Sequence, residues 1–189
     1  MSEDSRIRKT KINIKRSLIE LLKEKPINNI SVTELTELAD ISRKTFYLHY
    51  NSIYEAKEDI DNDLITQLNT ILSSISRESH SLNTYDIYSF FKQVNDITKK
   101  HSELVSYFIS NTKQSSLYMK VKQILKNSIL EWVNQNSSNP VYNDYLAEFV
   151  VSGVLSTYVQ WNNKNKNIPD NELNDMLTKL CSAAKELVK

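Results

Sequence analysis

The sequence contains only one glycine and three prolines among its 189 residues. Tight turns between strands depend on these two residues, because glycine accepts positive φ angles and proline fixes the first turn dihedral. Their scarcity favours helices joined by short polar loops, so we expect an all-α fold. Hydrophobic residues make up 40% of the chain and charged residues 25%, which is typical of a globular protein with a buried core.

Cys181 is the one cysteine in the chain. A single cysteine excludes an intrachain disulfide and a cysteine-based metal site, and we expect no metal and no cofactor. No apolar run approaches the roughly 18 residues that a membrane-spanning helix needs. The N-terminal run MSEDSRIRKTK lacks the apolar segment of a signal peptide. We therefore expect a cytoplasmic protein that makes no contact with membranes.

Catalysis is not expected. His80 and His101 have no carboxylate or cysteine at metal-ligand spacing, and Glu103 lies two residues from His101, which is the wrong spacing for a shared helix face. A single glycine cannot form a phosphate-binding glycine loop. The sequence therefore indicates a binding protein and not an enzyme.

The charge is unevenly distributed along the chain. Residues 5–50 carry ten Lys or Arg and five Asp or Glu, whereas residues 51–189 carry fourteen and sixteen. A basic segment attached to a mildly acidic body indicates a polyanionic partner. Basic solvent-exposed surfaces also occur in proteins that bind no nucleic acid, so charge alone leaves the partner open.

An amphipathic helix is predicted over residues 10–24. Its apolar side chains recur every three or four residues and share one face. They are Ile14, Leu18, Leu21 and Leu22. The helix should end at Lys25, because the residue before Pro26 disfavours the helical conformation.

A second, short helix is predicted over residues 32–39. Ser31 and Glu34 have the spacing of a capping box, in which each side chain bonds to the other residue's backbone N–H. The side chains expected on its core face are Leu35, Leu38 and Ala39. This helix would support the element that follows it.

A third helix is predicted after a break at Asp40-Ile41. Ser42 can cap it, and it carries residues 43–50. Phe46 and Tyr50 lie four residues apart and share the face toward the core. Two short helices joined by a three-residue turn, the second rich in basic, hydroxyl and aromatic side chains, are typical of a helix-turn-helix.

The rest of the chain also has helical spacing. The predicted segments are 52–76, 85–100, 102–111, 116–135, 141–163 and 170–188. With the first three they make about nine helices. We expect residues 1–56 to form a helix-turn-helix DNA-binding domain and residues 57–189 a helical regulatory and dimerisation domain, with the boundary inside the 52–76 helix.

Several runs carry a resemblance to a known family. They are Ile14-Lys-Arg-Ser-Leu-Ile-Glu-Leu-Leu22, Ile30-Ser-Val-Thr-Glu-Leu35, Leu38-Ala39 and Ile41-Ser-Arg-Lys-Thr-Phe-Tyr-Leu-His-Tyr50. From Thr10 to about Ala56 the chain closely resembles the DNA-binding domain of the TetR/AcrR family of transcriptional regulators. Gly153, Trp161 and Pro169 are spaced as in the last two helices of a subgroup common in Gram-positive bacteria. The resemblance implies a bacterial regulator whose C-terminal helical bundle binds a ligand and dimerises.

The chain departs from the family pattern at three positions. Asp40 stands at the turn position often held by glycine, and aspartate accepts the left-handed conformation more readily than most residues, so the turn should be kept. Lys44 replaces a small residue and adds charge to the recognition helix. Ile53 replaces a lysine that often meets phosphate, so no such contact is expected there.

Eight residues are predicted to bind DNA. They are Thr33, Ser42, Arg43, Lys44, Thr45, Tyr47, Leu48 and His49. The resemblance implies phosphate contacts by Tyr47 and His49, whose phenol and imidazole can donate to phosphate oxygens. Thr33 lies beside free backbone N–H groups at a helix N-terminus, where anions bind.

The other predicted contacts are to base edges. Arg43, Lys44 and Thr45 lie at the front of the recognition helix, where helix-turn-helix proteins meet the bases. Arginine and lysine can pair with guanine, and the methyl groups of Thr45 and Leu48 can touch a thymine methyl. A basic arm before the first helix would follow the DNA backbone or minor groove. Its residues are Arg6, Arg8 and Lys9.

The segments 141–163 and 170–188 have wide apolar stripes. Paired with the same helices of a second chain they would form a four-helix bundle, which predicts a homodimer. The predicted interface residues are Phe149, Gly153, Tyr158, Trp161, Leu173, Leu177 and Leu180. The alternative is that both stripes are buried within one chain.

Aromatic residues are abundant between 85 and 161. Their number favours a pocket for a small, largely apolar effector between the helices. The alternative is that these residues simply form an aromatic-rich core. The candidate pocket residues are Phe91, Tyr107, Tyr118, Trp132 and Tyr158. The predicted function is a sequence-specific regulator that binds an operator, acts as a repressor and is released by the effector. The alternatives are an architectural or co-regulator-dependent DNA-binding protein without a small effector, and a binding module that has lost DNA affinity.

Overall fold

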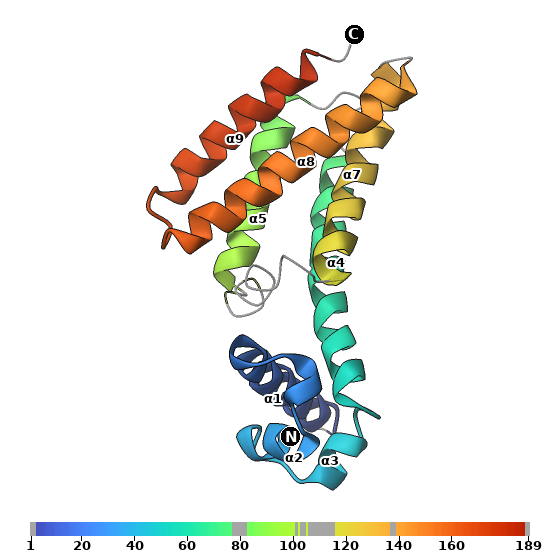
Figure 1. The fold of residues 1–189 in the computed structure, drawn as a ribbon, viewed down its shortest axis with the longest axis vertical. Coiled ribbons are helices and arrows are strands. Elements are labelled where there is room, and N and C mark those ends of the chain that lie inside the picture. Colours follow the sequence, from blue (N-terminus) through green and yellow to red (C-terminus); the bar gives the residue numbers. More distant parts are fainter. Residues whose placement is uncertain are drawn as a thin grey trace. The chain divides into compact units, whose positions relative to one another are not determined.

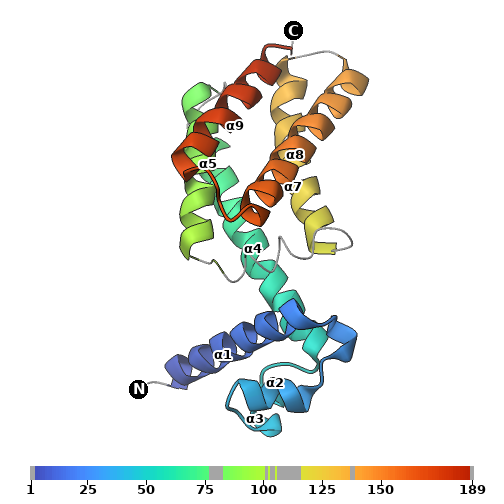
Figure 2. The same cartoon turned by 60° about the vertical axis from the view of Figure 1, so that its left-hand side comes forward.

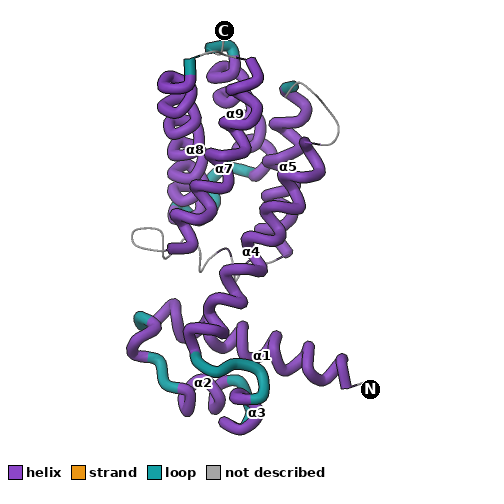
Figure 3. The backbone as a smooth tube through the Cα atoms, turned by 90° about the vertical axis from the view of Figure 1, so that its right-hand side faces the viewer, coloured by secondary structure: helices purple, strands orange, loops and turns teal. Residues whose placement is uncertain are grey.

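The computed structural model describes residues 3–76, 83–100, 102, 105, 116–136 and 139–187. These residues contain eight α-helices, one short 3-10 helix and no strand, which confirms the predicted all-α fold (Figure 3). The elements are α1 Glu3–Glu24, η1 Ile27–Asn29, α2 Val32–Leu38, α3 Arg43–Tyr47, α4 Ile53–Ser76, α5 Thr84–Lys100, α7 Ser116–Asn136, α8 Pro140–Asn163 and α9 Asp170–Lys185. Among the described residues, no helix combines the length and apolarity needed to cross a bilayer.

Two compact units divide the chain. The first contains the described residues up to Thr66 together with residues 102 and 105, and the second contains those from Gln67 to Lys100 and from Ser116 onward. Helix α4 begins in the first unit and ends in the second (Figure 1). Each unit has its own core, and each is described separately below.

Helix α1 begins earlier than the sequence predicted. It starts at Glu3, so Arg6, Arg8 and Lys9 are exposed residues of a helix, and the expectation of a separate arm before the helix is wrong. No glycine or proline interrupts this stretch.

The predicted capping box at the start of α2 is confirmed. Ser31 Oγ accepts from the backbone N–H of Glu34 at 3.1 Å. A hydrogen bond from Lys25 is the main cause that lowers the pKa of Glu34, and a hydrogen bond from the Ser31 backbone N–H lowers it further. The cap therefore defines where α2 begins.

One side chain of α2 lies on the opposite side from the predicted one. Leu35 and Ala39 are buried as expected, but Leu38 is exposed. Thr36 takes the buried place beside Leu35, and its hydroxyl donates to the carbonyl of Thr33 at 2.9 Å. A buried threonine is tolerated because this local bond satisfies its hydroxyl. The core face of α2 therefore includes Thr36 in place of Leu38.

The turn between α2 and α3 keeps the expected conformation. Asp40 has φ 53°, in the left-handed region that an aspartate tolerates. The N–H of Ile41 then bonds to the carbonyl of Thr36 at 3.0 Å, which closes the end of α2. Ser42 Oγ accepts from the N–H of Thr45 at 3.0 Å and caps α3. The helix-turn-helix predicted from the sequence is confirmed.

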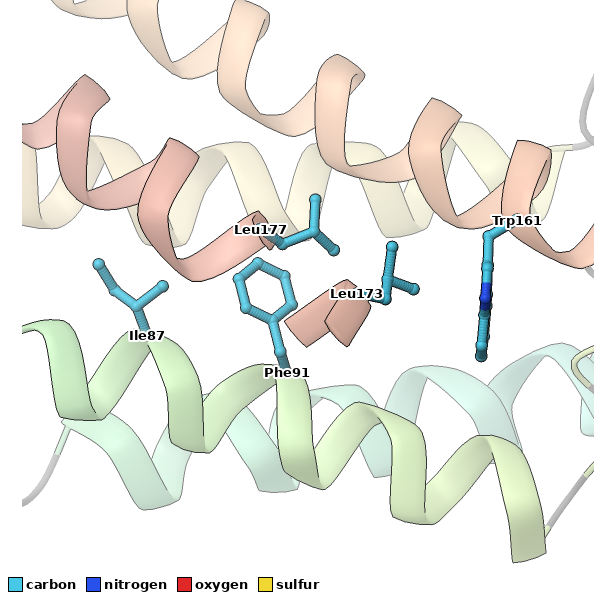
Figure 4. Close-up of a cluster of buried hydrophobic side chains, with 5 residues drawn as sticks. All are labelled: Ile87, Phe91, Trp161, Leu173 and Leu177. Atoms are coloured by element: carbon cyan, nitrogen blue, oxygen red, sulfur yellow. The ribbon is translucent and has the colours of Figure 1, made fainter. Parts of the chain in front are cut away.

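In the second unit, α5 packs against α9 and α7 packs against α8 (Figure 2). The core between α5, α8 and α9 is formed by Ile87, Phe91, Trp161, Leu173 and Leu177. In Figure 4, Ile87 and Phe91 point from α5 toward Leu173 and Leu177 of α9. Trp161 closes one end, and its indole N–H donates to the carbonyl of Ile168 at 2.8 Å, which ties down the connection between α8 and α9.

Candidate nucleic-acid interface and ligand cavity

Helix α3 is held to the first unit by two aromatic side chains. Phe46 is 0% exposed and Tyr50 is 3% exposed. Their ring centroids lie 6.0 Å apart, and the ring of Tyr47 packs edge-on against Phe46 at 5.4 Å. A five-residue helix is too short to be stable by itself, so this packing maintains it.

The opposite face of α3 carries the predicted DNA-binding side chains. Arg43, Lys44, Tyr47 and Leu48 are exposed, with Leu48 74% exposed although it is apolar. His49 is half-buried at the end of the same segment. An exposed surface with two cations, a phenol and an apolar side chain offers the groups that phosphates and base edges accept.

The remaining predicted DNA contacts lie at helix N-termini. Ser42 and Thr45 share the cap of α3, with their hydroxyl oxygens 2.8 Å apart. Thr33 is exposed in the first turn of α2, one residue after Val32 begins the helix. Each of these hydroxyls lies beside backbone N–H groups of a first helical turn.

The position of Ile53 agrees with its apolar character. Its side chain is buried at the start of α4, so it presents nothing to a phosphate. The neighbouring Tyr54 is exposed, and its hydroxyl donates to the side-chain oxygen of Asn28 at 2.8 Å. This bond connects α4 to the η1 segment within the first unit.

Sequence reasoning missed a polar cluster beneath α3. The Tyr50 hydroxyl donates to Asp59 Oδ2 at 2.6 Å. Lys15 Nζ lies 3.1 Å from the same oxygen and 2.7 Å from Asp63 Oδ2, and Lys11 Nζ lies 3.6 Å from Asp59. Lys11 and Lys15 are four residues apart on α1, and Asp59 and Asp63 are four apart on α4. Two matched stripes of opposite charge were the signal that could have revealed the cluster.

The protonation states of this cluster follow from its contacts. Burial raises the pKa of Tyr50 above its ordinary value, and the hydrogen bond to Asp59 raises it further, so the phenol stays a donor. Burial acts to raise the pKa of Asp59, but hydrogen bonds from Tyr50 and Lys15 and the charges of Lys15 and Lys11 hold it below its usual value. The carboxylate is therefore charged at neutral pH.

The second unit contains a cavity of about 320 Å³. Its walls come from the end of α4 and from α5, α7, α8 and α9, and most of the lining side chains are apolar. The lining includes Leu72, Phe90, Phe91, Ile129, Trp132, Val150, Val154 and Cys181. Polar lining residues are fewer: Asp86, Ser128, Glu131, Gln135 and Lys185. Apolar walls with a few polar groups are typical of a small-molecule site.

Two of the five predicted pocket residues line this cavity. Phe91 and Trp132 line this cavity. Tyr158 lies in the core beside Phe91, with ring centroids 6.3 Å apart, and its hydroxyl donates to Asn95 Oδ1 at 3.3 Å. Tyr118 borders a separate hollow against the end of α8. Tyr107 lies outside the described residues, as do His80 and His101.

Two cavity residues have distinctive chemistry. Burial raises the pKa of the Cys181 thiol to about 11, so it is an unreactive thiol at neutral pH. Lys185 Nζ lies 5.6 Å from the ring centroid of Trp132. The sequence did not predict that either residue lines a cavity, because which side of α9 faces α7 depends on tertiary packing.

The predicted dimer residues differ in how much of each side chain is exposed. Trp161, Leu173 and Leu177 lie in the core of the second unit, and their side chains are not on its surface. Tyr158 is half-buried, whereas the exposed members are Phe149, Gly153 and Leu180. A methyl group added to Gly153 would meet no other atom within 4 Å. Val141, Tyr145 and Met176 are also exposed apolar residues of α8 and α9, although they are not among the predicted interface residues.

Among the described residues, no three or more His, Cys, Asp or Glu side chains are grouped in a way that could hold a metal ion.

Three solved structures align with the chain over 90% or more of its length. A TetR-family regulator from Streptomyces coelicolor aligns with a TM-score of 0.67 at 16% identity, covering 100% of this chain and 83% of its own. A TetR regulator from Streptococcus agalactiae 2603V gives 0.64 at 18% identity, covering 94% and 96%. The fatty acid degradation regulator FadR from Bacillus halodurans gives 0.68 at 12% identity, covering 90% and 93%. At these identities the likeness establishes the fold.

The family assignment comes from the sequence of the second unit. Among curated proteins, no match was found. A family model of the TetR C-terminal region, described as a transcriptional regulator C-terminal region, matches residues 85–183, which is more than half of the chain. The helix-turn-helix observed before these residues is the arrangement that the resemblance of Thr10 to Ala56 implies. The chain belongs to the TetR family of transcriptional regulators.

Proposed function

We propose that the chain is a sequence-specific DNA-binding regulator that reads an operator with α3. Residues 1–56 bind DNA, and residues 57–189 bind the effector and dimerise. The observation that carries this proposal is the two-sided character of α3, with Phe46 and Tyr50 buried and Arg43, Lys44 and Tyr47 exposed. A helix anchored in this way presents a fixed set of polar groups to the major groove.

The roles of the DNA-binding residues follow their chemistry. Tyr47, His49 and Thr33 bind phosphates, and Ser42 supports them at the cap of α3. Arg43, Lys44, Thr45 and Leu48 contact base edges. Phosphate contacts add affinity for every sequence, whereas base contacts distinguish one sequence from another. Substitutions in the two groups should therefore have different signatures.

Replacing a base-reading side chain should relax sequence preference. We expect Arg43→Ala or Lys44→Ala to cost about 1–3 kcal/mol on the selected DNA, with the loss confined to particular base pairs. Tyr47→Ala and His49→Ala should weaken binding to all sequences alike, because phosphate contacts are the same in every sequence. The measurement is a salt titration with DNA that the wild-type chain selects from a random pool, compared with a scrambled duplex.

Tyr47→Phe is the matched control, because it keeps the ring and removes only the phenolic donor. It should reproduce the loss seen with Tyr47→Ala if the hydroxyl binds phosphate. Equal affinity of the wild-type chain for selected and scrambled DNA at physiological salt would contradict the proposed function as a whole.

The proposed regulation is repression that a small apolar effector relieves. The cavity of about 320 Å³ supports this, because it lies among largely apolar side chains and has a few polar groups at hand. Helix α4 contributes Leu72 and Ile75 to its lining and also carries Ile53 and Ile60 in the first unit. An effector that prefers one arrangement of α4 would change DNA affinity, and the coupling would be reciprocal, typically about 1–3 kcal/mol.

Filling the cavity should abolish the response to the effector. Val150→Phe adds a ring to a lining position, so a metabolite extract that releases the wild-type chain from its selected DNA should no longer release the variant. DNA affinity without extract should stay unchanged. Met119→Phe, a similar enlargement at an exposed position of α7, should respond as the wild type does.

Cys181 provides a direct measure of occupancy. It is the only cysteine of the chain and lines the cavity. Labelling by a small thiol reagent at alkaline pH should slow when the extract is present, because the ligand covers the thiol. If the extract releases the Val150→Phe variant as well as the wild type, the effector acts elsewhere or a protein co-regulator is needed.

A further inference from the structure

Asp59 is the residue at which three segments of the first unit meet through polar contacts. It lies on α4, and one of its oxygens accepts from the Tyr50 hydroxyl at 2.6 Å. Two lysines of α1 approach the same oxygen, Lys15 at 3.1 Å and Lys11 at 3.6 Å. The side chain of Asp59 is 32% exposed, so these are partly desolvated contacts. None of the residues predicted to touch DNA belongs to this cluster.

The contact from Tyr50 matters because of what Tyr50 supports. The Tyr50 N–H bonds to the carbonyl of Phe46 at 3.0 Å, so Tyr50 continues the last turn of the α3 segment. Its ring packs against Phe46, and Lys11 Nζ lies 5.0 Å from its centroid. Helix α3 has only five residues, which leaves its orientation to these anchors. A hydroxyl held at 2.6 Å fixes how deeply the Tyr50 ring is seated.

Asp59 also balances charge behind the recognition helix. Lys15 is shared between Asp59 and Asp63, with its Nζ 2.7 Å from Asp63 Oδ2. Removing either carboxylate leaves more positive charge on α1, which would raise the affinity for any DNA sequence. Removing Asp59 also takes away the acceptor of the Tyr50 hydroxyl. The two aspartates therefore share the charge effect, and Asp59 has a contact that Asp63 lacks.

We propose that Asp59 is a positioning residue for DNA reading, which acts through Tyr50 to set the orientation of α3. It raises the affinity for the selected sequence relative to other sequences without touching DNA. This inference rests on the proposed function of α3. The pair Tyr50 and Asp59 is thus a specificity-determining contact located on the far side of the recognition helix.

The test compares three variants of the full chain on two DNA duplexes. Tyr50→Phe keeps the ring and removes the hydroxyl, and Asp59→Asn keeps the shape and removes the charge. Asp63→Asn is the matched control, because it removes a charge from the same cluster without touching Tyr50. The probes are the duplex selected by the wild-type chain from a random pool and a scrambled duplex, and the readout is the ratio of the two affinities.

We expect Tyr50→Phe to lower this ratio about tenfold, the size expected for losing a hydrogen bond to a charged group. Asp59→Asn should lower it by less, because its amide oxygen can still accept from the Tyr50 hydroxyl but lacks the charge that strengthens the bond. For Asp59→Asn, affinity for the scrambled duplex should rise or stay constant. Asp63→Asn should shift both affinities together and keep the ratio. Because their effects act through one contact, Tyr50→Phe and Asp59→Asn combined should lower the ratio no further than Tyr50→Phe alone.

Each outcome has a distinct meaning. A merely structural role would lower the thermal midpoint of Tyr50→Phe and Asp59→Asn but leave the ratio unchanged in the folded protein, and that result would overturn the inference. A ratio lowered equally in Asp63→Asn would also overturn it, since charge alone would then explain the effect. If the wild-type chain selects no sequence at all, the proposed function fails, and this inference fails with it.

Discussion

Replacing Phe46 with alanine should lower the free energy of unfolding of the first unit by about 3–5 kcal/mol. Phe46 is 0% exposed and is among the largest fully buried side chains of the chain. Its removal leaves a cavity beneath a five-residue helix whose other aromatic anchor is Tyr50. Sequence-specific DNA binding should therefore be lost even at temperatures where the second unit remains folded.

Two control variants separate the effect of the buried Phe46 from that of the exposed, DNA-facing side of α3. Phe46→Leu retains most of the buried volume and should cost much less stability, with partial DNA binding. Tyr47→Ala removes a neighbouring ring that is 49% exposed, so it should reduce DNA affinity with little change in stability. Urea unfolding and DNA titration on the same samples measure both quantities. Specific DNA binding by Phe46→Ala equal to that of the wild type would show that α3 does not depend on this anchor.

Local signals were sufficient to predict the helix-turn-helix. Ser31 and Ser42 accept bonds from N–H groups three residues ahead, and Asp40 adopts the left-handed turn. Each of these features is decided within a few residues, so one sequence contains the information. Leu38 was assigned to the wrong face because a seven-residue helix gives periodicity too few repeats to place its core face to within one residue.

Features that depend on distant segments were not predictable. Lys15 and Asp63 are 48 residues apart. Their helices carry stripes of opposite charge, but no local signal shows that these two stripes meet each other. For the apolar stripes of α8 and α9, the sequence left open whether they pack within one chain or against a second chain. Periodicity shows that a face is apolar, but it does not show whether the partner lies in the same chain. Leu173 and Leu177 pack within the second unit, whereas Phe149 and Leu180 are exposed.

These exposed residues predict that Phe149→Arg converts the proposed homodimer to a monomer. Val141, Tyr145, Phe149 and Gly153 follow one another at intervals of four along α8, and such rows form the ridges that pack between helices. Tyr145 is 72% and Phe149 74% exposed. Two such ridges that meet across a two-fold axis would come closest at Gly153, which has no side chain. The space beside Gly153 is not filled by other atoms of the same chain. A charged guanidinium placed in that contact would be buried without a partner.

Loss of the dimer should lower DNA affinity more than removal of any single protein–DNA contact does. A two-fold dimer places two α3 helices one DNA turn apart, roughly 34–36 Å or a multiple, so the second half-site is bound at high effective concentration. Separating the protomers should weaken binding to a two-site operator by about 10²–10⁴-fold and leave binding to a single half-site unchanged. Light scattering at micromolar concentration gives the mass, and titrations with the two duplexes give the affinities.

Tyr85→Arg is the matched control, because Tyr85 is an equally exposed aromatic residue on α5, away from the α8 ridge. A Phe149→Arg variant that remains dimeric, or a wild-type chain that is already monomeric, would remove α8 from the proposed interface.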